Sequence, residues 1–190
     1  MKNLNIGFAL TGSFCTFDKV LPVLEKISEY NNVTPIFSYS VRDMDTRFYK
    51  AADLAHDVEK ITGNKPIATI PEAEPIGPKN LFDLLIIAPC TGNTLTKLNH
   101  AITDTPVLMA AKATLRNDKP VLIAISTNDG LSGNARNFGD LLNKKFVFFV
   151  PFGEDNPIRK PNSLVADFDM LIQAAEAALK NRQLQPIIKG

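Results

Sequence analysis

Residues 81–94 read LFDLLIIAPCTGNT and join the strongest apolar run of the chain to a run of small polar residues. The apolar part, 81–88, is largely continuous rather than alternating, which is typical of a β-strand covered on both faces of a parallel sheet. The polar part ends in Gly92, Asn93 and Thr94, which are typical of a loop that opens a helix. The stretch therefore predicts a buried parallel strand followed by a crossover helix.

Other apolar runs alternate with amphipathic segments on both sides of this stretch. Further strands are expected at 4–10, 35–39, 120–126 and 145–150, with a weaker one at 65–70. Helices are expected at 17–30, 47–62, 94–102, 106–116, 134–142 and 165–181. The proline-rich segment 70–80 is expected to be a rigid extended loop. This alternation predicts an α/β fold, a three-layer doubly wound parallel sheet of the Rossmann-like type.

Composition limits the classes of function. The 190 residues are 45% hydrophobic with a formal net charge of +1, which predicts a single domain over residues 1–190 and no binding surface for nucleic acid. No apolar run approaches the length of a membrane span, and we expect no membrane partner. Two cysteines are too few for a disulfide scaffold, which indicates a cytoplasmic protein. No pattern of metal ligands is found.

Small polar residues follow several of the expected strands. They are Thr11, Gly12 and Ser13 after the first strand, Ser38 and Ser40 after the second, 89–94 after the strongest, and 126–130 after the next. Each loop alone is explained by helix capping, but together at the carboxyl edge of a parallel sheet they predict a pocket. Helix starts and hydroxyls bind an anion without a basic patch. Because the three-glycine dinucleotide pattern and the Walker lysine loop are both missing, a mononucleotide such as FMN is favoured over NAD or ATP.

The segment APCTGNTLTKL at 88–98, together with Thr-Gly-Ser at 11–13, resembles the flavoprotein family that includes flavin-containing cysteine decarboxylases and flavin prenyltransferases. Longer segments, among them EAEPIGPKN, FVPFGEDNP and KPNSLVADFDML, resemble the B-subunit family of bacterial dipicolinate synthases. The resemblance implies a flavoprotein fold with FMN as cofactor. It places the FMN phosphate near Gly12, Ser13, Ser38 or Ser40, Thr91, Asn93 and Thr94. The flavin ring would lie near Pro89, Ser126, Thr127 and the rest of the loop 126–129.

The resemblance to the decarboxylases is incomplete. Those enzymes carry a histidine shortly before the strongest strand and a Pro-x-Met-Asn motif after the next one, whereas 70–80 contains no histidine and 126–129 reads STND. His56 and His100 fall in expected helices, where exposed or structural roles are favoured. Decarboxylation and flavin prenyl transfer therefore remain alternatives, as does a noncatalytic scaffold that has lost FMN.

The resemblance to the B subunits implies a sporulation enzyme of the mother-cell cytoplasm. With an A subunit it would oxidise dihydrodipicolinate, from the lysine pathway, to dipicolinate. The electron acceptor would be FMN on this chain or NADP on the A subunit. A homo-oligomer is also implied.

A dicarboxylate substrate requires cationic anchors. Candidates are Lys97, Lys112, Arg116, Arg136, Arg159 and Lys160, each of which is otherwise an ordinary solvated charge. Catalytic residues are not identified, and the candidates are Asp129 as a proton acceptor, Arg136 and Lys160. Asp129 has the alternative role of capping its own loop. Cys15 and Cys90 follow strands expected to be neighbours, where a core role and redox chemistry are both open.

Overall fold

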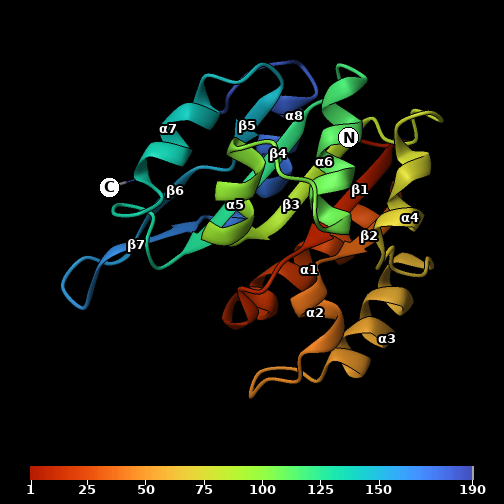
Figure 1. Cartoon of the computed structure of the whole chain (residues 1–190), viewed down its shortest axis with the longest axis horizontal. Coiled ribbons are helices and arrows are strands. Elements are labelled where there is room, and N and C mark those ends of the chain that lie inside the picture. Colours follow the sequence, from red (N-terminus) through yellow and green to blue (C-terminus); the bar gives the residue numbers. More distant parts are fainter. Residues whose placement is uncertain (190) are drawn as a thin grey trace.

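The computed structural model describes residues 1–189, and its centre is a parallel sheet. Five parallel strands lie in the order β2-β1-β3-β4-β5, which is the doubly wound arrangement expected from the sequence. The strands are β1 (Asn5–Leu10), β2 (Asn32–Phe37), β3 (Leu84–Cys90), β4 (Val121–Thr127) and β5 (Val147–Phe149). All seven residues of β3 are buried, as the continuous apolar run predicts. Every carboxyl end in this layer therefore opens at one edge (Figure 1).

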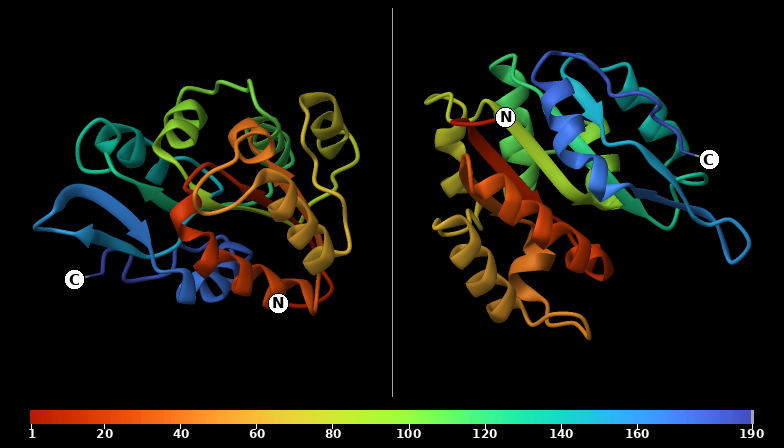
Figure 2. Two further views of the ribbon diagram at one scale, coloured as in Figure 1. Left: turned by 90° about the horizontal axis from the view of Figure 1, so that it is seen from below. Right: turned by 180° about the vertical axis from the view of Figure 1, so that it is seen from behind.

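Helices cover both faces of the sheet, which gives the three layers visible in Figure 2. α1 (Phe17–Ser28) and α8 (Leu171–Ala178) pack on one face, and α5 (Gly92–Asn99) and α6 (Pro106–Arg116) pack on the other. α7 (Ala135–Leu142) lies beside α5, and α3 (Ala51–Thr62) packs against α1 and the edge strand β2. A short helix, α2 (Tyr39–Asp43), follows β2. The helices bury their apolar stripes against the strands, which stabilises the core.

A β-hairpin interrupts the expected all-parallel pattern. β6 (Phe152–Asn156) pairs antiparallel with β7 (Lys160–Ala166), and β7 pairs antiparallel with the last residues of β4. The sheet of the described residues is therefore mixed. The helix expected at 165–181 begins only at Leu171, because Leu164, Val165 and Ala166 are strand residues that imitate an apolar helix stripe.

Two expectations near residue 70 are wrong. The extended loop at 70–80 is instead a short helix, α4 (Ile70–Ala73), followed by a 3₁₀ turn, Glu74–Ile76. A capping box between Thr69 and Glu72 starts the helix, and its proline lies in the first turn, where a missing N–H is tolerated. The strand expected at 65–70 is reduced to an isolated bridge between Ile67 and Ile36.

Candidate active site

A cavity of about 780 Å³ lies where the carboxyl ends of β1, β3 and β4 meet the β6–β7 hairpin. Of the residues singled out in the sequence, it is lined by Gly12, Ser13, Cys15, Thr91, Gly92, Asn93, Ser126, Thr127, Asn128, Asp129 and Lys160. These residues come from loops far apart in the chain, and the parallel topology brings their ends together. The volume is within the range of small-molecule sites, roughly 300–1,000 Å³.

The first loop is joined to its two neighbours by hydroxyl groups. Thr11 is 1% exposed, and its Oγ1 donates to the carbonyl of Pro89 at 2.8 Å and accepts from the backbone N–H of Thr91 at 3.0 Å. Ser13 Oγ lies 2.7 Å from Ser126 Oγ. These contacts fix the loops after β1, β3 and β4 relative to one another, so the floor of the cavity is preorganised.

The predicted phosphate hydroxyls bond to one another in pairs. Thr91 caps α5 by accepting from the Thr94 N–H, and the two hydroxyls lie 3.1 Å apart. Ser38 caps α2, and its Oγ lies 3.0 Å from that of Ser40. Ser38, Ser40, Pro89 and Thr94 stand behind the cavity lining, although a Cβ on Gly12 would lie 2.9 Å from Ser40 Oγ. Ser38 and Thr91 thus cap helices and also bond to a second hydroxyl. A role for these hydroxyls in holding a phosphate stays a prediction.

The Asp129 carboxylate is held from two sides. Oδ1 accepts from the hydroxyl of Thr127 at 2.5 Å, and Oδ2 accepts from the side-chain amide of Asn134 at 2.8 Å. The ideal Cβ position of Gly92, the first residue of α5, lies 2.6 Å from Asp129 Oδ1 and 2.5 Å from the Asn134 amide nitrogen. The carboxylate therefore lies against the amino end of α5, where the helix dipole favours negative charge.

Among the candidate cations only Lys160 lines the cavity. It pairs with Asp155 across the hairpin, and the Asp155 carboxylate raises the pKa of Lys160 by accepting a hydrogen bond from its ammonium group. Arg136 is 92% exposed on α7 and lies 3.7 Å from Asp140, while Lys97 pairs with Asp104 at 2.6 Å. Lys112, Arg116 and Arg159 are exposed outside the cavity lining, as are His56 and His100.

The sequence analysis missed several wall residues. They are Phe14, Thr16, Lys19, Phe48, Asp155, Ser163, Leu164 and Val165. The last four lie on or beside the hairpin, which no expected element anticipated. The sequence of β7, KPNSLVA, does not alternate between polar and apolar residues, so it offered no clear strand signal. The aromatic rings of Phe14 and Phe48 add apolar surface to a cavity that is also lined by polar and charged side chains.

Both cysteines are unpaired thiols in the described chain, and they differ in exposure. Cys15 is exposed and lines the cavity, whereas Cys90 is buried in β3. Burial raises the pKa of the Cys90 thiol because the thiolate would lose its solvation. We expect a thiol reagent to modify about one thiol per native chain and the second only after unfolding. Equally fast modification of both in the native protein would contradict this assignment.

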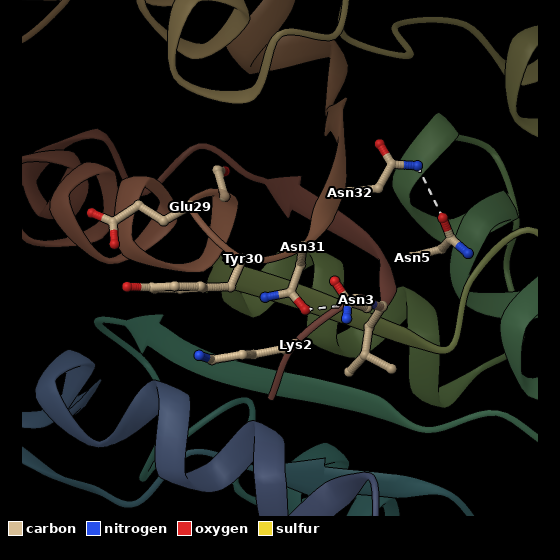
Figure 3. Close-up of a pocket in the computed structure, with 9 residues that line it drawn as sticks. Lys2, Asn3, Asn5, Glu29, Tyr30, Asn31 and Asn32 are labelled. Carbon is tan, nitrogen blue, oxygen red and sulfur yellow. Dashed lines mark hydrogen bonds between the residues drawn. The ribbon is translucent and has the colours of Figure 1, made fainter.

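Another hollow, of about 530 Å³, lies at the opposite edge of the sheet beside the starts of β1 and β2 (Figure 3). The Asn32 amide donates to Asn5 there at 2.9 Å, and Lys2 Nζ lies 4.6 Å from the centre of the Tyr30 ring. This is the amino edge of the parallel strands, away from the ligand-binding edge of such folds. Residues 1–189 contain no group of His, Cys, Asp and Glu arranged to hold a metal ion, and no helix among them is long and apolar enough to span a membrane.

Comparisons with known proteins agree with this architecture. The B subunit of dipicolinate synthase from Bacillus subtilis (strain 168) is 48% identical over 189 residues, which cover 99% of this chain and 94% of that protein. The crystal structure of the corresponding B subunit from Bacillus halodurans superimposes with a TM-score of 0.91 at 45% identity, covering 100% of this chain and 97% of the other.

More distant structures share the fold. A dodecameric FMN-dependent UbiX-like decarboxylase from Escherichia coli O157:H7 has a TM-score of 0.62 at 20% identity, with 80% of each chain covered. The family model described as Flavoprotein matches residues 1–162, which include β1 to β4 and most of the cavity wall. The chain therefore belongs to the Flavoprotein family, together with the B subunits of dipicolinate synthase.

Proposed function

We propose that this chain is the B subunit of a dipicolinate synthase. It acts with an A subunit to oxidise dihydrodipicolinate, from the lysine pathway, to dipicolinate in the mother-cell cytoplasm of a sporulating bacterium. The observation that carries the proposal is 48% identity over nearly the whole length to the Bacillus subtilis protein. The match spans the cavity loops and the hairpin, so residues 1–190 are proposed to work as one domain.

We infer that the cavity holds FMN, which fits the residues present. Gly12 and Ser13 offer a close backbone approach and a hydroxyl donor for the phosphate. The Asp129 carboxylate already lies against the start of α5 and would repel a phosphate there. The phosphate is therefore assigned to the end of the cavity formed by the first loop. Asn93, Thr127 and the aromatic wall then face the ring. When bound, FMN would supply an acceptor for a hydride.

Substrate binding is assigned to the hairpin side. Lys160 presents an ammonium group to a substrate carboxylate, and Asp155 holds that group in place until the substrate arrives. Lys19, also on the wall, offers a second cation for a dicarboxylate. The A subunit completes the site and, in the alternative form of the proposal, takes the electrons on NADP. Lys160 and Lys19 would together fix the orientation of the substrate ring, and correct orientation of the reactants accelerates a reaction.

Coexpression with the A subunit tests the function directly. We expect the purified complex to form dipicolinate, followed by its absorbance, while the A subunit alone at the same concentration forms much less. Appearance of reduced flavin or of NADPH identifies the acceptor. Equal product from the A subunit alone would overturn the proposal. A colourless chain that does not change FMN fluorescence in a titration would favour the noncatalytic scaffold over a flavin enzyme.

The Asn93→Asp variant should weaken FMN binding about tenfold. Asn93 is exposed on the cavity wall, and a carboxylate there adds a second negative charge beside Asp129 in a cavity proposed to hold FMN, which is itself an anion. Fluorescence titration with FMN measures the change. Gln173→Glu, an equal change of charge at an exposed position of α8, is the control and should bind FMN as the unmodified chain does. An unchanged affinity for Asn93→Asp would exclude Asn93 from the site.

A homo-oligomer is also proposed. The fold is shared with a decarboxylase whose structure is dodecameric. Light scattering on the purified chain should give a mass that is a multiple of 20.8 kDa. A monomer at micromolar concentration would contradict this part of the proposal.

A further inference from the structure

Asn134 occupies the N-cap position of α7 but does not cap the helix. An asparagine at this position normally accepts from an amide of the first turn and stabilises a helix by about 1 kcal/mol. Within residues 1–189 the Asn134 side chain makes no such bond. It is 4% exposed, and its amide nitrogen donates to Asp129 instead. The chain therefore forgoes a cap to supply a donor to one carboxylate.

The neighbours of Asn134 fix the direction of its amide. Its Oδ1 accepts from the hydroxyl of Thr96 at 2.6 Å and from the amide of Asn137 at 3.1 Å. Asn137 in turn accepts from Asn99 at 3.0 Å. Because Oδ1 faces two donors, the amide nitrogen must face Asp129. Each amide thus donates toward the next, and the series ends at the carboxylate.

This polar seam lies between α5 and α7, where packed helices would ordinarily bury apolar side chains. Asn137 is 7% exposed, and no buried side-chain polar atom among the described residues lacks a hydrogen-bond partner. A fully bonded buried network gives rigidity rather than maximal stability. The network therefore holds the side chain of Asp129, which lines the cavity, in a fixed position.

Asp129 retains acceptor capacity on the cavity side. A carboxylate has about four lone-pair positions, and the side chains of Thr127 and Asn134 use two of them. A free acceptor position matches a ligand group that donates an N–H. Both ligands of the proposed reaction have such groups: the flavin ring at its N3 position, and a partly reduced pyridine ring in its enamine form.

We propose that Asn134 is a positioning residue that holds the Asp129 side chain as a hydrogen-bond acceptor for the N–H of a bound nitrogen heterocycle. The inference rests on the proposed function, because it takes the ligand class from it. It assigns a role to a side chain that the sequence pattern presents as a helix cap. It also explains why Gly92 bears no side chain, since a Cβ would occupy the space of the two groups that hold the carboxylate.

FMN titration and steady-state kinetics of the complex with the A subunit test the inference. Asn134→Ala and Asp129→Asn should each weaken one ligand by about tenfold, as a rise in the FMN dissociation constant or in KM with a smaller change in kcat. The double variant should be no weaker than Asp129→Asn alone, because Asn134 acts only through Asp129. Thr127→Val, which removes the other donor with little change in shape, provides a second route if Asn134→Ala folds poorly.

Asn137→Ala is the control, since it removes an amide from the same seam while the Thr96 hydroxyl still donates to the Asn134 oxygen and the bond from Asn134 to Asp129 stays in place. It should change ligand affinity no more than about twofold. An FMN analogue methylated at N3 separates the sources: if the flavin N–H is the donor, methylation weakens binding to the unmodified chain but not to Asp129→Asn. If Asn134→Ala and Asp129→Asn raise KM for the substrate and leave the FMN dissociation constant unchanged, the donor is the substrate.

Two results would overturn the inference. One is an unmodified complex that binds FMN and substrate normally while Asn134→Ala, Thr127→Val and Asp129→Asn bind both equally well. The other is equal loss of affinity in Asn137→Ala and Asn134→Ala, which would indicate a structural role only. Failure of the proposed function is distinct, because the unmodified complex itself would then form no dipicolinate, and absence of any heterocycle binding by it would remove both proposals.

Discussion

Replacing Gly92 by alanine should both destabilise the chain and abolish tight ligand binding in the cavity. The added Cβ would lie 2.5 Å from the Asn134 amide nitrogen and 2.6 Å from Thr127 Oγ1 and Asp129 Oδ1. Thr127 and Asn134 both donate to the Asp129 carboxylate, at Oδ1 and Oδ2 respectively, so the clash cannot be relieved by moving one side chain alone. We expect a loss of about 1–3 kcal/mol in the free energy of unfolding, as for other overpacked sites. Denaturant unfolding and FMN titration measure the two effects.

Gly139→Ala is the matched control for this variant. Gly139 lies inside α7, and a Cβ built there meets nothing within 4 Å. Alanine is the better helix former, so this variant should be more stable by about 0.5–1 kcal/mol and should bind ligand normally. Equal stability and equal FMN affinity of Gly92→Ala and the unmodified chain would show that the loop after β4 is not tightly held against α5.

Thr11→Val should be the most destabilising change of nearly constant shape in the site. Its hydroxyl serves two backbone groups on the loop after β3, the Pro89 carbonyl and the Thr91 N–H, and valine can serve neither. Leaving both groups unsatisfied should cost about 2–4 kcal/mol in the free energy of unfolding. The urea midpoint should fall with an unchanged slope, because the surface exposed on unfolding stays the same.

Thr114→Val supplies the comparison. Thr114 is 2% exposed, close to the 1% of Thr11, but its hydroxyl only adds a bond to the Ala110 carbonyl within α6. That carbonyl lies within the helix, where it keeps its backbone bond. The loss should therefore stay below about 1.5 kcal/mol. If the two valine variants were equally stable, the bridge made by Thr11 would contribute nothing beyond an ordinary buried hydroxyl.

The parallel layer was predictable because its signal is local. Continuous apolar runs such as 81–88 identify strands buried on both faces, and polar residues at their ends identify the ligand-binding edge. The short helix α4 and the 3₁₀ turn after it were obscured by their prolines, because proline breaks a helix interior but is tolerated in the first turn, where both prolines stand. The hairpin was missed because β6 is FGEDN, with little apolar content to mark it as a strand.

The candidate site was predictable only in part. The loops that meet at the cavity follow from topology, as Ser13 and Ser126 illustrate by bonding across 113 positions of sequence. The partners within those loops do not follow, because hydrogen-bond choice depends on the three-dimensional approach of side chains. Asn134 stood only as the first residue of an expected helix, and Arg136 was a candidate site cation, yet Asn134 bonds to Asp129 and Arg136 is exposed to solvent.

One edge of β4 is shared between two partners. Residues 121–123 pair with β5 in the parallel layer, and Ser126 and Thr127 pair with β7 of the hairpin. The first residues of β4 therefore belong to the parallel layer, whereas its last residues pair with the hairpin and line the cavity. Substitutions in the hairpin can therefore alter this wall of the cavity without disturbing the strand pairing of the parallel layer.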